Sequence, residues 1–84
     1  MIDQGAEWVM EPAKAWKWAM GEVEAAKNGS HRPVKNIHNA ADMIWARFYT
    51  NGMWSPAAEK VYLMLREATG MAQDEYEKAQ PSME

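Results

Sequence analysis

Apolar residues recur at steps of three and four along three stretches of the chain, 12–28, 33–50 and 55–69. This spacing places them on one side of an α-helix and leaves polar residues on the other. No run of alternating β-branched and polar residues indicates a strand. The pattern therefore predicts three amphipathic helices, the second most clearly, with an apolar side formed by Val34, Ile37, Ala41, Ile44, Trp45 and Phe48.

Proline, serine and glycine mark where the predicted helices begin and end. Pro12 and Pro56 suit the first turn of a helix, where a missing N–H removes no hydrogen bond, and Ser55 is a favourable N-cap. Gly70 is expected to end the third helix, because glycine readily adopts the left-handed conformation of a C-cap. A short fourth helix is then expected over 72–79.

The two ends of the chain are expected to be less regular. In the N-terminal segment 1–11, residues 3–10 are expected to form a short helical turn, separate from the first long helix because the residue before a proline disfavours helical backbone. The alternative is that they begin a longer, kinked helix. Residues 80–84 are expected to fray. The whole chain, 1–84, is then one all-α domain: a three-helix bundle with a short fourth C-terminal helix and a short N-terminal helical turn, since short connections favour antiparallel neighbours.

Size and composition limit the stability of the chain. A fold of 84 residues buries only about 60–65% of the surface that its unfolded chain exposes. Cysteine is absent from the sequence, so neither a disulfide nor a thiolate metal site can add stability. The first residues lack the pattern of a secretory signal, and no apolar run is long enough to span a membrane, so we expect a soluble, cytoplasmic protein.

Each predicted long helix carries one large apolar residue opposite its apolar side, namely Trp18, Met43 or Leu63. Such residues are hard to bury in the same core, and Trp and Met are frequent in protein interfaces. The functional interpretation is a surface that binds another protein. A helix enclosed on both sides, or single exposed residues without a role, would produce the same pattern.

The predicted connection between the second and third helices contains two more large apolar residues, Met53 and Trp54. Trp54 either closes the end of the core or anchors a partner, since a loop at the end of a bundle can direct a side chain either way. Arg47, on the same side of the second helix as Met43, is a candidate rim residue. The sequence does not fix how the helices are rotated, so the candidates need not all share one surface. The predicted protein-binding residues are Trp18, Met43, Arg47, Met53, Trp54 and Leu63.

Charges are separated along the chain, although the net charge is only −3. Acids predominate in 1–26 and 67–84, and bases predominate in 27–66. A basic group surrounds the start of the second helix, where free backbone N–H groups also attract anions. The candidates for phosphate binding are Lys27, His31, Arg32 and Lys35. Four cations in an acidic chain are too few for strong duplex binding, so nucleic acid is the less favoured ligand.

No arrangement of residues indicates catalysis, a cofactor or a metal. His38 and Asp42 lie one helical turn apart, but a metal site needs three or four donors, so we expect an ordinary hydrogen-bonded pair. The serines occupy predicted caps and turns, which is not the arrangement of a nucleophile with a histidine base and an orienting acid. We therefore expect a non-enzymatic protein with no cofactor and no metal.

The leading hypothesis is a small module that acts by stoichiometric binding to another protein, either a second copy in a homodimer or a larger protein. In length, tryptophan content and lack of cysteine, the chain resembles accessory inhibitors carried by bacteriophages, which implies inhibition of a host protein complex. The alternative is a binder of nucleotide or nucleic-acid phosphates in which a Trp or Tyr side chain stacks on a base. Salt separates these hypotheses, because phosphate binding weakens steeply as salt rises.

Overall fold

The structure, a computed structural model, describes residues 11–80. Three long helices, α2 (Pro12–Ala26), α3 (Arg32–Ile44) and α4 (Pro56–Ala79), make up most of this range, and a π-helical turn, η1 (Trp45–Tyr49), continues α3. No strand occurs among these residues. The all-α class is therefore confirmed for the described part of the chain, whereas the predicted N-terminal turn and frayed C-terminal residues fall almost entirely outside it.

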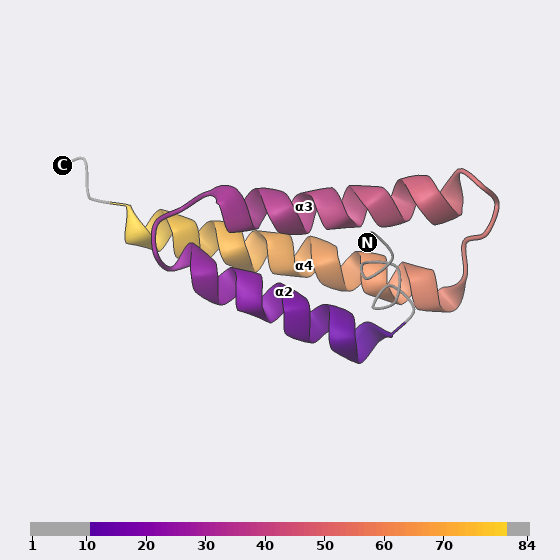
Figure 1. The fold of residues 1–84 in the computed structure, drawn as a ribbon, viewed down its shortest axis with the longest axis horizontal. Helices are drawn as coiled ribbons and strands as arrows, with labels where there is room; N and C mark the ends of the chain where they lie inside the picture. Colours follow the sequence, from indigo (N-terminus) through magenta and orange to yellow (C-terminus); the bar gives the residue numbers. More distant parts are fainter. Residues whose placement is uncertain (1–10, 81–84) are drawn as a thin grey trace, which may run out of the picture.

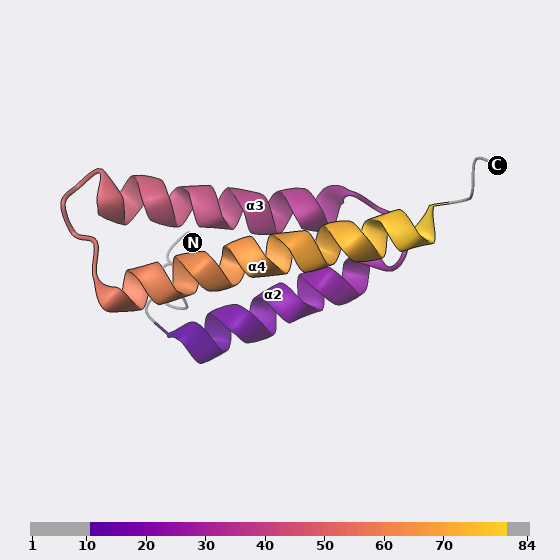
Figure 2. The same ribbon diagram turned by 180° about the vertical axis from the view of Figure 1, so that it is seen from behind.

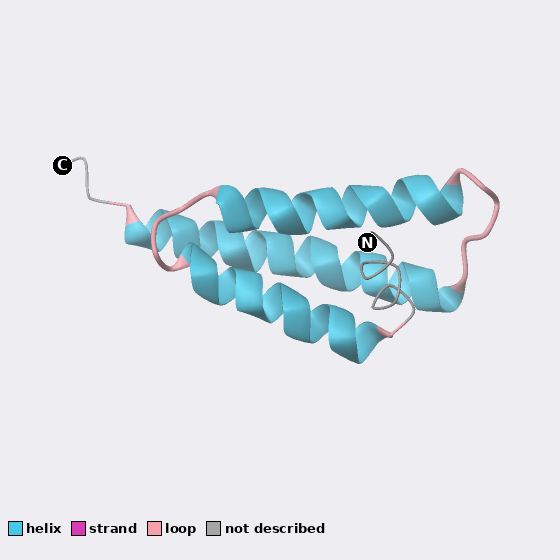
Figure 3. Cartoon of the chain, viewed as in Figure 1, coloured by secondary structure: helices cyan, strands magenta, loops and turns pink. Residues whose placement is uncertain are grey.

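The three long helices lie side by side, and each contacts the other two. Helix α3 runs opposite to α2 and α4, with α2 and α3 on the near side in Figure 1 and α4 nearest the viewer in Figure 2. The two connections lie at opposite ends of the helices (Figure 3). This arrangement places the end of η1 beside the start of α4.

The helix starts follow the local rules. The Ser55 hydroxyl accepts a hydrogen bond from the Ala58 N–H at 3.2 Å, and Pro56 occupies the first turn of α4. Glu11 has extended backbone before Pro12, as the residue before a proline favours. The beginnings of α2 and α4 therefore match the predicted helices within one residue.

The predicted end at Gly70 is wrong, because α4 continues through this residue without interruption. The predicted fourth helix, 72–79, is the last part of α4. Ala68 and Ala72 are both fully buried on either side of Gly70, so one continuous apolar side crosses the glycine. Packing along that side outweighs the helix penalty of glycine, which is about 1 kcal/mol. Among the described glycines only Gly29 and Gly52 have positive φ.

The core consists mainly of small side chains. Its largest fully buried side chains are Ile37, Ile44, Leu65 and Val61. The remaining positions are filled largely by alanine, on every long helix: Ala15, Ala19, Ala26, Ala40, Ala41, Ala58, Ala68 and Ala72. Small side chains allow close helix packing, which leaves little room for rings. Accordingly, every aromatic side chain between residues 11 and 80 is at least partly exposed to solvent.

Candidate functional site

Four aromatic rings contact one another where η1, the following connection and α4 meet. We call Trp45, Tyr49, Trp54 and Tyr62 the aromatic cluster. Trp45 and Tyr49 are stacked, with ring centroids 4.1 Å apart and an interplanar angle of 15°. Trp54 makes edge-to-face contacts with the other three rings, at centroid distances of 5.8, 5.9 and 5.8 Å. The Trp45 ring also lies 5.8 Å from that of Tyr62, so both tryptophans contact every other ring and join the cluster together.

The cluster is anchored on one side and open on the other. Trp54 and Tyr62 are half-buried and pack against the core. Trp45 and Tyr49 are 41% and 52% exposed. Aromatic pairs in such arrangements are worth about 0.5–1.5 kcal/mol beyond the area they bury, so the rings hold one another in place. A partner would meet a preformed apolar surface and lose little free energy in ordering it.

The π-helical turn η1 carries two of these rings, and side chains and backbone of the next residues complete its hydrogen bonding. The last four carbonyls of a helix have no partner within the helix, so they need donors from elsewhere. Here the next residues supply them. The donor–acceptor pairs are Thr50 Oγ1 to Ala46 O, Asn51 Nδ2 to Arg47 O at 2.6 Å, Gly52 N to Tyr49 O at 3.1 Å, and Met53 N to Phe48 O at 2.7 Å.

Gly52 explains why the chain can turn so sharply here. Its φ of 69° lies in the left-handed region, which glycine adopts without the clash that a Cβ brings. The turn brings Trp54 back against the rings of η1. Single π turns are frequent at functional sites, which agrees with the position of the exposed rings.

Charged residues of both signs border the aromatic cluster. Arg66 Nη1 donates a hydrogen bond to the Tyr62 hydroxyl at 2.7 Å, and its guanidinium carbon lies 5.6 Å from the centre of that ring. Arg47 is exposed on η1. The acids Asp42 and Glu59 each precede a ring of the cluster by three residues, or about one helical turn. The border of the cluster is therefore mixed in charge.

The structure does not bring the three residues predicted from helix geometry onto one surface. Trp18 is half-buried and packs against the core. Met43 is 40% exposed. It lies on the same side of α3 as Asn36, two turns earlier, and the Asn36 side chain donates a hydrogen bond to Glu22 of α2 at 3.3 Å. Met43 is therefore on the α2 side of α3. Leu63 is 56% exposed and lies about 160° around α4 from the buried core side.

The other predicted binding residues lie in or beside the aromatic cluster. Trp54 belongs to it and also packs on the core, so it closes the end of the core and supports the exposed rings at once. Met53 and Arg47 are exposed next to it. Sequence reasoning assigned Trp45 to the buried side of its helix and did not single out Tyr49.

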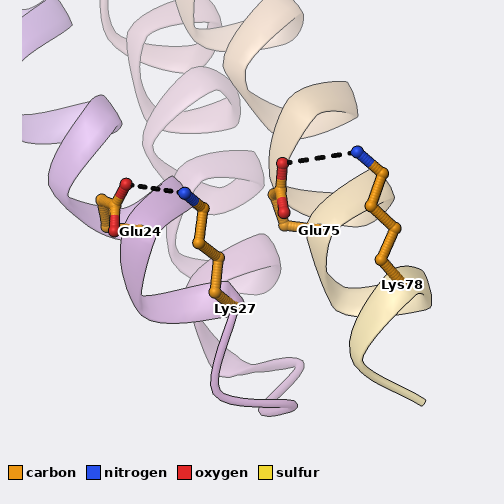
Figure 4. A network of polar contacts seen from close by, with 4 residues as sticks. All are labelled: Glu24, Lys27, Glu75 and Lys78. Atoms are coloured by element: carbon orange, nitrogen blue, oxygen red, sulfur yellow. Dashed lines mark hydrogen bonds and ion pairs between the residues drawn. The ribbon is translucent and has the colours of Figure 1, made fainter. Parts of the chain in front are cut away.

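The predicted basic group is divided in the structure. Lys27 donates a hydrogen bond to the Glu24 carboxylate at 2.8 Å. This hydrogen bond, together with the negative charges of Glu24 and Glu75, raises the pKa of Lys27 above its ordinary value. Figure 4 shows this pair beside the ion pair of Lys78 with Glu75, whose atoms are 3.7 Å apart. Lys27 therefore belongs to a charge-paired surface between α2 and α4.

His31 and Lys35 instead line a pocket of about 360 Å³ between α3 and α4. Arg32 is exposed and outside its lining. Among residues 11–80, the lining residues are His31, Val34, Lys35, His38, Asn39, Thr69 and Gln73. Of the four predicted phosphate-binding residues, only His31 and Lys35 line the pocket. Its other polar lining residues are His38 and Asn39 of α3 and Thr69 and Gln73 of α4.

Both histidines of the pocket have polar partners. His31 Nε2 lies 3.1 Å from the Gln73 side-chain oxygen, and the His31 ring packs edge-on against Tyr76 at 4.8 Å. His38 Nε2 lies 3.4 Å from the Asp42 carboxylate, the contact that their helical spacing predicts. Among residues 11–80, no group of three or more His, Cys, Asp or Glu side chains is arranged to hold a metal ion.

No family model matches this chain, and neither the curated proteins nor the solved structures contain a match. None of the described helices combines the length and apolar character needed to cross a membrane. Because no relative indicates a function, the aromatic cluster and the pocket between α3 and α4 are the candidate functional sites of this protein.

Proposed function

We propose that this protein acts by stoichiometric binding to another protein and that the aromatic cluster is its contact surface. The carrying observation is the stacked pair Trp45 and Tyr49, which stays exposed while Trp54 and Tyr62 hold it in place. Tyr, Trp, Met and Arg are the residue types enriched at protein interfaces. The cluster and its border with Arg47, Arg66 and Met53 contain all four types.

Scattered exposed apolar residues are ordinary on protein surfaces, but a contiguous group is not. The four rings form such a group, because Trp45 and Trp54 each contact the other three. Covering roughly 100 Å² on each of the two exposed rings would contribute about 2–3 kcal/mol apiece by the usual area relation. This gain is available only when a partner removes the rings from water.

The partner that we propose is a second copy of the chain. In a two-fold symmetric dimer the same surface meets itself, so each cation must find an acid of the same surface on the other copy. The mixed border meets this condition, because Arg47 and Arg66 occur with Asp42 and Glu59. Small folds with thin cores also commonly gain stability by oligomerisation. A larger protein, including a host complex inhibited by this chain, is the alternative partner for the same rings.

Solution mass as a function of concentration tests this proposal. We expect the wild-type protein to pass from monomer to dimer between roughly micromolar and millimolar concentration, as measured by size-exclusion chromatography with light scattering. Tyr49→Ser should raise the dimer dissociation constant by at least about tenfold, because it removes a ring from the centre of the contact. Circular dichroism should show unchanged helix content.

Leu63→Ser is the matched control. Leu63 is 56% exposed, close to the 52% of Tyr49, but it lies on the outer side of α4. The control should dimerise like the wild type. A wild-type monomer throughout the concentration range, or equal weakening by both substitutions, would contradict dimerisation through the aromatic cluster.

A further inference from the structure

The pocket between α3 and α4 gathers cationic side chains although the chain as a whole is acidic. His31, Lys35 and His38 follow one another at steps of four and three residues, which places them on one side of α3. The facing wall comes from Thr69 and Gln73, one turn apart on α4. Three nitrogen groups able to carry positive charge therefore border a single concave space.

Two hydrogen-bond donors of the pocket are unused. Within residues 11–80, neither the Lys35 ammonium nor the Asn39 amide has a hydrogen-bond or ion-pair partner. Gln73, in contrast, donates to the Glu77 carboxylate at 2.8 Å while its oxygen faces His31. The Thr69 hydroxyl donates to the Leu65 carbonyl at 2.8 Å, so it can offer a ligand only an acceptor. The free donors are thus on α3, beside the histidines.

The chemistry and size of the pocket indicate its ligand. Ammonium, imidazolium and amide N–H groups together suit the three terminal oxygens and the negative charge of a phosphate monoester. A volume of about 360 Å³ lies at the lower end of small-molecule sites, which span about 300–1,000 Å³, and exceeds the need of a bare phosphate ion. Val34 adds an apolar part to the wall. We propose that this pocket binds a small phosphate monoester.

The surroundings of the pocket favour one phosphate over a chain of phosphates. Lys27 is paired with Glu24, and Arg32 stands outside the lining. The last turns of α4 carry the acids Asp74, Glu75 and Glu77, which would repel a nucleic-acid backbone. The pocket shares no residue with the aromatic cluster, although Asp42 pairs with His38 of the pocket and also precedes Trp45 of the cluster by about one helical turn.

Each histidine that borders the pocket has neighbours that a bound anion would also meet. His31 faces Gln73 and Tyr76 of α4, with Lys35 one turn along α3. His38 faces the Asp42 carboxylate, with Lys35 and Thr69 also on the pocket wall. Asp42 and Glu77 are therefore the acids that a bound phosphate would have to tolerate.

Titration of the full chain followed by ¹H–¹⁵N NMR tests the proposal. The probes are inorganic phosphate, phenyl phosphate and adenosine monophosphate, each added at pH 6 and at pH 8. We expect saturable shifts centred on residues 31–39, 69 and 73, with at least one ester binding about fivefold or more tighter than inorganic phosphate. The tighter ester distinguishes an aryl phosphate from a nucleotide as the preferred ligand.

Inorganic sulfate tests the same pocket with a tetrahedral dianion that carries no ester group. His38→Gln should weaken sulfate binding, because it removes one of the nitrogen groups that border the pocket. Unchanged sulfate affinity in this variant would overturn the role of His38.

Two lysine variants test where the anion sits. Lys35→Gln should weaken binding of the better ester by about fivefold or more, because it removes the unpaired ammonium of the pocket. Lys60→Gln removes the same charge from an exposed position near the start of α4 and should change the affinity less than twofold. Equal weakening by both, shifts centred outside the pocket, or no ester preference would each overturn the proposal. Tyr49→Ser should leave phosphate binding intact.

Discussion

Replacing Leu65 with alanine should destabilise the protein by about 3 kcal/mol or more, whereas the same replacement at Leu63 should change stability by less than about 0.5 kcal/mol. The two leucines are on one helix, two residues apart. Leu65 is fully buried and is one of the few large side chains in the core, while Leu63 is exposed. Removing Leu65 leaves a cavity that alanine neighbours are too short to fill.

Urea unfolding monitored by circular dichroism measures both effects. A domain of this size has a total stability of roughly 4–12 kcal/mol, so Leu65→Ala should shift the midpoint strongly or unfold the protein outright. Leu63→Ala serves as its internal comparison, since it removes the same atoms. Similar losses for both variants would mean that the described core does not support the fold.

The second large effect concerns Gly70 within α4. Gly70→Pro should destabilise the protein by about 3 kcal/mol or more, because proline removes a helical hydrogen bond and clashes with the preceding turn. Gly70→Ala should stabilise it by about 0.5–1 kcal/mol, since alanine is the better helix former. A Cβ at this position would meet no atom within 4 Å beyond the helix's own backbone.

The sign of the Gly70→Ala effect separates a continuous helix from a helix end. If a helix ended at this glycine in left-handed conformation, alanine would be strained and the substitution would destabilise the protein. Gly52→Ala is the comparison, because Gly52 has a φ of 69° and alanine should lower stability there by about 1 kcal/mol. Thermal unfolding of Gly70→Pro, Gly70→Ala and Gly52→Ala measures the expected losses and the expected gain in stability.

Periodicity in the sequence predicts the helices and much of the core side of α3. Val34, Ile37, Ala41 and Ile44 are buried as their spacing indicates. The same pattern placed Trp45 on this side, yet its ring is exposed. Helical spacing gives the direction of a side chain only while the helix stays regular. The π-helical turn begins at Trp45, and the Trp45 ring lies against Trp54 and Tyr62.

The continuity of α4 could not be inferred from local rules. Glycine ends many helices, so local rules predict 72–79 as a separate element. Its inclusion in α4 depends on contacts between residues far apart in sequence, such as His31 with Gln73 and Tyr76. Local propensity is weaker than burial along a continuous apolar side.

The candidate sites are predictable from the sequence only where they depend on residues close together in the chain. Trp54 and Met53 could be singled out because large apolar residues in a short connection are unusual. The association of Trp54 with Trp45, Tyr49 and Tyr62 depends on the π turn and on how α4 packs against α3. The basic group is the converse case: Lys27 and His31 are near in sequence, but their nearest charged and polar partners come from different helices.

The alanine-rich core also sets how the protein responds to temperature. The heat-capacity change of unfolding follows the apolar surface that becomes exposed, and it is about 12–15 cal/mol/K per residue in ordinary globular proteins. Here the largest apolar side chains are partly in contact with water before unfolding begins. The heat-capacity change should therefore be smaller than usual and the stability curve flatter, so that stability varies little between cold and physiological temperatures.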